Sequence, residues 1–148
     1  MRTNKSATST RTSRGTAFLL SFFLLVFANL VCTIIGWFHS VDVKTWWPLG
    51  LGIGIAISGL YALALSLLSS LSLQRLVVVN IALVVALVAH SCLYYLDRPN
   101  WLAVNNGEAK LTTLQSIVFN HYAYFALYVI FLGIAFVLAY AQRSPRGQ

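Results

Sequence analysis

Polar side chains that could bind a cofactor or move a proton lie inside long apolar stretches of this sequence. They are Asn29, Asn80, His90, Asn120 and His121. A polar group in the hydrocarbon of a bilayer is costly, so its presence can mark a functional site. Two chemistries follow from these residues. His90 and His121 could ligate haem or a metal together, and Asn29 with both histidines could form a path for a proton or a small solute.

The depths of the two histidines in their helices bear on the haem hypothesis. With a rise of 1.5 Å per residue, His90 would lie about 9 Å below the outer end of its helix and His121 about 6 Å below its own. Similar depths are compatible with a shared site. His121 also suits an interfacial position, and His90 could instead bond a backbone carbonyl or Asn29. We therefore predict no bound cofactor and keep haem as the alternative.

No arrangement of residues specifies catalysis. The three acids, Asp42, Asp97 and Glu108, fall outside the apolar stretches, and Asp97 beside Arg98 most simply forms a solvated pair. The histidines have no cysteine or serine partner at a characteristic spacing. The aromatic residues around Tyr124 are better explained by an interfacial belt and helix packing than by a substrate cage. The sequence predicts a protein that is not an enzyme.

Glycines alternate in the stretch WWPLGLGIGIAISG, residues 46–59, but they do not form a dinucleotide-binding fingerprint. From Gly50 the third position of G-x-G-x-x-G is Ile55, and from Gly52 it is Ile57. Instead, small residues recur every four positions, which suits close helix packing in lipid. This predicted small-residue ridge comprises Gly50, Gly54, Ser58, Ala62, Ser66 and Ser70, and Ala82 and Ala86 repeat the spacing in the next helix.

The composition is that of a membrane protein. Of 148 residues, 59% are hydrophobic and only 9% are charged, whereas soluble domains carry about 25% charged residues. The formal charge is +7, but the basic residues are scattered through short polar gaps. Binding of nucleic acid needs a concentrated basic face, so we exclude nucleic acid as a partner.

Four charge-free segments are long enough to cross a bilayer, at about 17–38, 49–73, 76–96 and 117–141. Backbone groups in lipid must be hydrogen-bonded internally, so each segment should be a helix. We expect an all-α integral membrane protein with four transmembrane helices in an antiparallel bundle. The transmembrane domain would cover 16–142, between a disordered basic tail at 1–15 and a short basic tail at 143–148.

The connections between the spans differ in length. Gln74 and Arg75 mark a tight turn, which predicts a closely packed hairpin of the second and third helices. The stretch 97–116 is longer and contains a turn signal at 105–107. Its second half could form helical turns that lead straight into the fourth span. Tryptophans near the ends of the spans are predicted interfacial anchors, namely Trp37, Trp46, Trp47 and Trp101.

The amino-terminal region raises the question of targeting. The first span, with 22 apolar residues, exceeds a signal-peptide core of about 7 to 15, so we expect a retained helix. The Ser-, Thr- and Arg-rich tail before it would be disordered, could touch anionic lipid, and also resembles an organelle transit peptide. Cys32 and Cys92 lie in apolar stretches, where two free thiols are commoner than a bridge.

The basic residues predict the orientation. With the amino terminus in the cytoplasm, that side holds Arg2, Lys5, Arg11, Arg14, Arg75, Arg143 and Arg146, and the far side holds Lys44, Arg98 and Lys110. Seven against three favours both termini on the cytoplasmic side. We expect an endomembrane or the plasma membrane, with a mitochondrial or other organelle membrane as the alternative.

The layout resembles that of MARVEL-type four-span membrane proteins. The local similarity is Ala89-His90-Ser91-Cys92 near the end of the third span. A second similarity, to the jagunal family, rests on the pairs Trp46-Trp47 and Tyr94-Tyr95 and on Trp101. Both resemblances imply membrane organisation or trafficking without catalysis.

These observations predict a non-catalytic multi-pass protein that organises or assembles membrane proteins or lipids, as a scaffold, trafficking factor or accessory subunit. Its partners would be lipids, other membrane proteins or further copies of itself. The alternatives are a small-solute or proton pathway, and a membrane anchor subunit that binds haem or quinone through His90 and His121.

Overall fold

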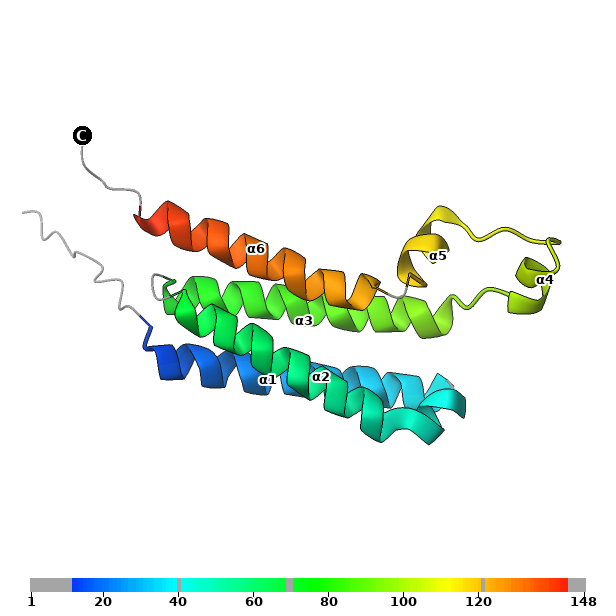
Figure 1. Cartoon of the computed structure of the whole chain (residues 1–148), viewed down its shortest axis with the longest axis horizontal. Coiled ribbons are helices and arrows are strands. Elements are labelled where there is room, and N and C mark those ends of the chain that lie inside the picture. Colours follow the sequence, from blue (N-terminus) through cyan, green and yellow to red (C-terminus); the bar gives the residue numbers. More distant parts are fainter. Residues whose placement is uncertain (1–11, 40, 69–70, 121, 144–148) are drawn as a thin grey trace, which may run out of the picture.

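The computed structural model describes residues 12–39, 41–68, 71–120 and 122–143. All six elements in these ranges are α-helices (Figure 1). They are α1 (Arg14–His39), α2 (Val41–Leu67), α3 (Leu73–Leu96), α4 (Trp101–Asn105), α5 (Thr113–Val118) and α6 (Ala123–Arg143). The spans Arg14–His39, Lys44–Leu67, Leu73–Leu96 and Ala123–Ala141 are long and apolar enough to cross a membrane. The predictions of an all-α protein and of four such helices are confirmed.

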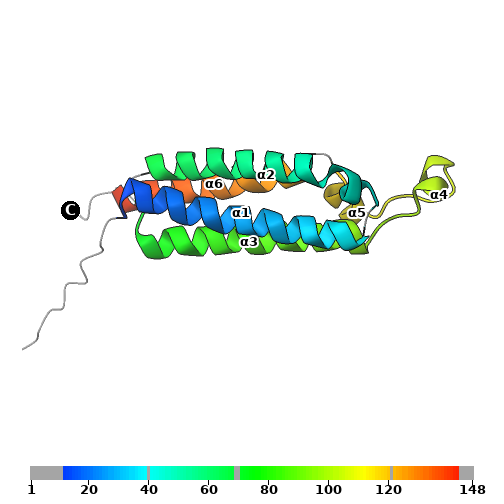
Figure 2. The same ribbon diagram turned by 90° about the horizontal axis from the view of Figure 1, so that it is seen from below.

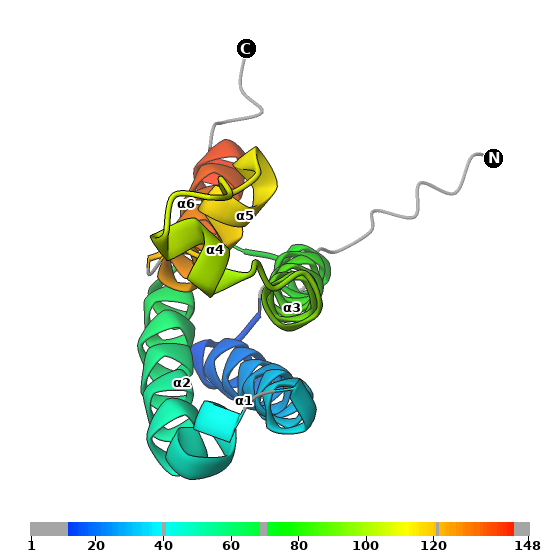
Figure 3. The same ribbon diagram turned by 90° about the vertical axis from the view of Figure 1, so that its right-hand side faces the viewer.

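The four long helices form a bundle in which sequence neighbours are not always spatial neighbours. Helix α1 contacts both α2 and α3, and α6 contacts α3 more extensively than α2. Within the described residues, α2 and α3 make almost no contact and lie diagonally across the bundle, as the end view in Figure 3 shows. The predicted close hairpin of the second and third helices is therefore wrong, because α1 occupies the position beside each of them.

Several boundaries differ from the predicted ones. Helix α2 begins at Val41, before Pro48, and ends at Leu67, so Gln74 and Arg75 belong to the first turns of α3 instead of the preceding turn. Proline removes a backbone donor and clashes with the preceding turn. Figures 1 and 2 show the first turns of α2 bent relative to the remainder of that helix.

The connection between α3 and α6 has its own structure. Gly107 has a φ of 77°, the left-handed conformation that the turn signal at 105–107 predicts. Helix α5 starts with a capping box in which Thr112 and Gln115 satisfy each other's backbone N–H groups. It ends at Val118, and α6 starts separately at Ala123. The expectation that these turns lead straight into the fourth span, and that this span starts at 117, is wrong.

The core consists of branched apolar side chains between the four long helices. The largest fully buried ones are Leu25, Leu65, Leu76, Leu83 and Leu87. Large apolar side chains on the outer faces are exposed in the isolated chain, including Phe27, Leu60, Val85 and Val129. This inversion of the usual exposure suits a bundle whose outer surface contacts lipid.

Candidate functional site: a cavity between the four helices

Asn29, in the middle of α1, is the centre of a buried hydrogen-bond network. Its Nδ2 lies 2.8 Å from the Leu25 carbonyl, 3.0 Å from Ser58 Oγ and 2.9 Å from the Tyr128 hydroxyl, so its two hydrogens are shared among three acceptors. Its Oδ1 accepts a hydrogen bond of 2.5 Å from the Tyr124 hydroxyl. One side chain of α1 therefore connects α2 and α6. We call Asn29, Ser58, Tyr124 and Tyr128 the Asn29 network.

Gly54 allows α2 to approach this network closely. A Cβ atom at this position would lie 2.5 Å from Asn29 Oδ1 and 2.8 Å from Asn29 Cγ, distances that real Cβ contacts do not reach. The Gly54 carbonyl also accepts a hydrogen bond of 2.8 Å from Ser58 Oγ. The missing side chain of Gly54 thus leaves the space that the Asn29 amide fills.

Only part of the predicted small-residue ridge is buried in the structure. Gly54, Ser58, Ala62 and Ser66 are buried, and they lie on the helix that contacts α1 most extensively. Gly50 is exposed, with no atom within 4 Å of where a Cβ would stand.

The other three positions of that pattern also differ from the prediction. Ser70 lies outside the described residues. On α3, Ala82 is exposed and Ala86 is half-buried, because α3 turns its leucines towards the core instead. The small-residue pattern of α3 therefore does not form a close interface with α2.

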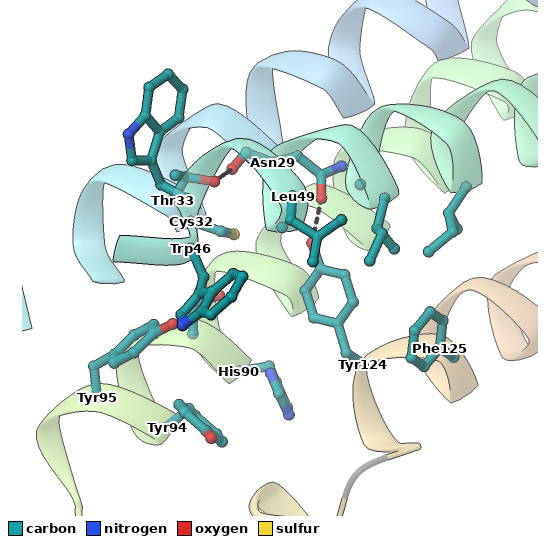
Figure 4. Close-up of a pocket in the computed structure, with 16 residues that line it drawn as sticks. Asn29, Cys32, Thr33, Trp46, Leu49, His90, Tyr94, Tyr95, Tyr124 and Phe125 are labelled. Atoms are coloured by element: carbon teal, nitrogen blue, oxygen red, sulfur yellow. Dashed lines mark hydrogen bonds between the residues drawn. The ribbon is translucent and has the colours of Figure 1, made fainter. Parts of the chain in front are cut away.

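A cavity of about 490 Å³ lies beside the Asn29 network, towards the end of the bundle that carries α5. All four long helices line it (Figure 4). The polar lining side chains are Asn29, Cys32, Thr33, His90 and Ser91. Most of the lining surface is aromatic or aliphatic, with Trp46 and Trp47 from α2, Tyr94 and Tyr95 from α3, and Tyr124 and Phe125 from α6.

The diagonal arrangement of α1 and α6 explains why a cavity forms here. The two helices do not contact each other extensively within the described residues, and the long Tyr124 side chain crosses the gap to reach Asn29. Figure 1 shows α2 and α6 diverging towards the α5 end. Leu49 and Ile53 of α2 and Phe125 of α6 line the cavity, and their side chains are exposed in the isolated chain. The cavity therefore communicates with the outer surface between α2 and α6.

His90 lies in the cavity wall and contacts the connection between α3 and α6. Its Nε2 is 3.1 Å from the Val118 carbonyl of α5. Its ring centroid is 5.8 Å from that of Tyr124 and 6.2 Å from that of Tyr94. The expectation that His90 could bond a backbone carbonyl is confirmed, whereas the expected partner His121 lies outside the described residues.

The other two predicted polar residues, Asn80 and Asn120, do not line the cavity. Asn80 donates to Ser21 Oγ at 2.9 Å and to the Leu76 carbonyl at 3.0 Å, and its buried Oδ1 has no partner in the described part of the chain. Asn120 is exposed between α5 and α6, where its Oδ1 accepts from the Tyr122 N–H at 2.9 Å. The prediction that Asn120 lies within a span is wrong, because that span starts later.

Both cysteines are free thiols, as expected. Cys32 is buried and its Sγ lies 3.6 Å from the Leu87 carbonyl, whereas Cys92 is half-buried. The described residues contain no group of three or more His, Cys, Asp or Glu side chains that could hold a metal ion. The four predicted anchors, Trp37, Trp46, Trp47 and Trp101, are all exposed.

The cavity was not predicted from the sequence, and Tyr124 was assigned to an interfacial aromatic belt and to helix packing. The available signal was the position of Asn29 and His90 along their helices. Both lie in the second half of their helix, and the aromatic residues Trp46, Trp47 and Tyr124 lie in the first half of theirs. No protein-family model, curated protein or solved structure matches this chain. The site therefore has to be interpreted from its own geometry.

Proposed function

We propose that this chain is a non-catalytic multi-pass membrane protein that organises bilayer lipids by holding one lipid molecule in the cavity that opens between α2 and α6. The observation that carries this proposal is the cavity of about 490 Å³, which has a polar inner wall and an aromatic and aliphatic rim. Ligand pockets of this size are mostly apolar, with a few polar groups that fix orientation. An amphipathic molecule matches both parts of the wall.

The position of the cavity along α2 supports a ligand from the bilayer. Trp46 and Ile57 both line the cavity, and their separation of eleven positions corresponds to about 16 Å of helix. That length extends from the interfacial tryptophans to about half of a hydrocarbon core of roughly 30 Å. A lipid could thus place its polar end within the cavity and extend its chains through the opening between α2 and α6.

We infer an antiparallel bundle with both termini on the cytoplasmic side. In Figure 1 the first residues of α1 and the last residues of α6 lie at one end of the bundle, and α4 and α5 lie beyond the other. Arg14 and Arg75 are in the first turns of α1 and α3, at the first of these ends, and Arg98 and Lys110 are at the other. We propose an endomembrane or the plasma membrane as the location.

The pathway alternative has less support from the side-chain positions. The Asn29 network and the Ser21–Asn80 pair are separate clusters. Leu25 lies between Ser21 and Asn29 on α1, Leu83 lies between Asn80 and the cavity residue His90 on α3, and both leucines are fully buried. A layer of leucine opposes the passage of an ion or a proton between the two polar clusters.

Lipid retention tests the proposal. We expect native mass spectrometry of the purified wild-type chain to show a bound lipid that survives delipidating detergent. Ile53→Trp should lower the occupancy at least fivefold, because an indole at this position fills the cavity. Ile55→Trp is the matched control, because Ile55 is exposed on the same helix and is not part of the lining. Equal occupancy in the two variants would refute a lipid site in this cavity.

A further inference from the structure

We propose that the cavity selects an uncharged amphiphile whose polar end is a hydroxyl group, and that this hydroxyl donates a hydrogen bond to Nδ1 of His90. This inference rests on the proposed lipid-binding function and specifies the chemical class of the ligand. It combines the charge of the lining, the hydrogen-bond state of His90 and the position of His90 in the cavity.

In the described part of the chain, the cavity lining contains no charged group of fixed sign. Among the described residues that form it, none is Asp, Glu, Lys or Arg. Burial of a phosphate or an ammonium group without a counter-charge is expensive in a medium of low polarity. Phospholipid headgroups and acyl carboxylates are therefore poor occupants, and the polar end of the ligand should be neutral.

Among the described lining residues, His90 carries the one imidazole, and a neutral imidazole nitrogen is a stronger hydrogen-bond acceptor than the hydroxyl groups that also line the cavity. Asn29 already uses its amide in the Asn29 network, and the Thr33 hydroxyl donates its proton to the backbone carbonyl of Asn29 at 2.8 Å. The Val118 carbonyl can only accept a hydrogen bond, so His90 Nε2 must carry the proton that it donates over 3.1 Å. In the neutral imidazole, Nδ1 is then an acceptor.

The surroundings of His90 favour a ligand hydroxyl at this point. Among the described residues, no hydrogen-bond donor is paired with Nδ1, while the ring stands between the aromatic rings of Tyr94 and Tyr124 (Figure 4). His90 lies six residues before the end of α3 at Leu96, which corresponds to about 9 Å of depth. The hydroxyl of a diacylglycerol or of a long-chain prenol can reach this depth while its chains remain in the bilayer.

Competition against a radiolabelled diacylglycerol, measured by scintillation proximity on the purified full chain, tests the inference. Unlabelled diacylglycerol and prenol distinguish the two sources of the hydroxyl. The methyl ether of the same diacylglycerol replaces the hydroxyl proton with a methyl group and so removes the donor, and phosphatidate replaces the hydroxyl with a charged phosphate. We expect the ether to compete at least fivefold more weakly than the alcohol, as the loss of one buried hydrogen bond implies. Phosphatidate should compete at least tenfold more weakly.

Variants of His90 identify the acceptor. In His90→Phe, which keeps a planar ring without nitrogen, alcohol and ether should compete equally. In His90→Gln, whose amide supplies both a donor and an acceptor, part of the preference for the alcohol should return. Competition by diacylglycerol but not by prenol would support the inference and identify diacylglycerol as the source of the hydroxyl.

The outcomes separate this inference from the proposed function. Equal competition by alcohol and ether on the wild-type chain, with binding that Ile53→Trp still abolishes, would overturn hydroxyl selection and leave lipid binding intact. Preferential competition by phosphatidate would overturn the inference in the same way. Binding of the labelled diacylglycerol that Ile53→Trp and Ile55→Trp affect equally would contradict the lipid site itself.

Discussion

At the scale of single residues, Asn29 connects α1 to α2 and α6 through hydrogen bonds. Its amide bonds to side chains of α2 and α6, and Gly54 gives it room. Hydrogen bonds between helices in a membrane contribute about 0.6 kcal/mol each on average. The Asn29 network makes three such bonds, so it is a substantial part of the connection between these helices.

Replacement of this asparagine should therefore destabilise the protein more than replacement of the other buried one. We expect Asn29→Leu to lower the free energy of unfolding by about 2 kcal/mol, since three interhelical bonds are lost and their partners stay buried. Asn80→Leu should cost less than about 1 kcal/mol, because within the described residues Asn80 has one interhelical bond, to Ser21, and its Oδ1 has no partner. Unfolding by dodecyl sulfate in mixed micelles measures both, and a larger loss for Asn80→Leu would contradict the assignment.

The sequence predicted which polar residues are buried better than it predicted their partners. Asn29 and Asn80 could be recognised because a buried amide in an apolar stretch needs partners. That Tyr124 and Tyr128 would be those partners of Asn29 depends on α6 lying across the bundle from α1, which no local pattern specifies. The cavity was not predicted either. Its wall combines residues of four separate helices, and no local sequence pattern specifies how these helices pack.

At the scale of helices, the small residues of α2 determine how closely it approaches α1. Gly54→Ala should lower the free energy of unfolding by about 1–3 kcal/mol, because its Cβ would overlap Asn29 and force the amide to move. Gly52→Ala is the matched control, since nothing lies within 4 Å of a Cβ there. A thermal unfolding scan in detergent that shows equal losses for the two variants would refute the close α1–α2 contact.

The existence of the four long helices was predictable because length and apolarity alone impose a helix in a bilayer. The sequence did not predict which of these helices would pack against one another. A tight connection between α2 and α3 suggested a close pair, yet α1 contacts both helices and α2 lies diagonally opposite α3. The break between α5 and α6 was also missed, because Asn120 was assigned to the interior of a span although it lies between the two helices.

At the scale of the whole molecule, the distribution of basic residues determines the proposed orientation. A cysteine introduced as Ser13→Cys should react with a membrane-impermeant maleimide only from the cytoplasmic side, and Glu108→Cys only from the opposite side. Both positions are exposed, one before α1 and the other after α4. The two native cysteines should first be replaced by alanine. Reaction of both introduced cysteines from the same side of sealed membranes would contradict the four-span topology.

The resemblances to MARVEL-type proteins and to the jagunal family stay predictions, because they rest on layout and a few local residues. They agree with the proposed role in organising a membrane without catalysis. The cavity adds a more specific hypothesis to them, namely that the molecule acts on its bilayer by holding a lipid between α2 and α6.

Photo-crosslinking by a diazirine-bearing diacylglycerol, with peptide mapping of the labelled residues, tests the lipid site most directly. We expect labelling to concentrate on cavity residues such as Ile53 and Phe125, and Ile53→Trp to remove it. The exposed outer residues Leu60 and Val129, which do not line the cavity, serve as the internal reference for general contact with lipid. Labelling that is equally strong at Leu60 and Val129, and unchanged by Ile53→Trp, would contradict a lipid site between α2 and α6.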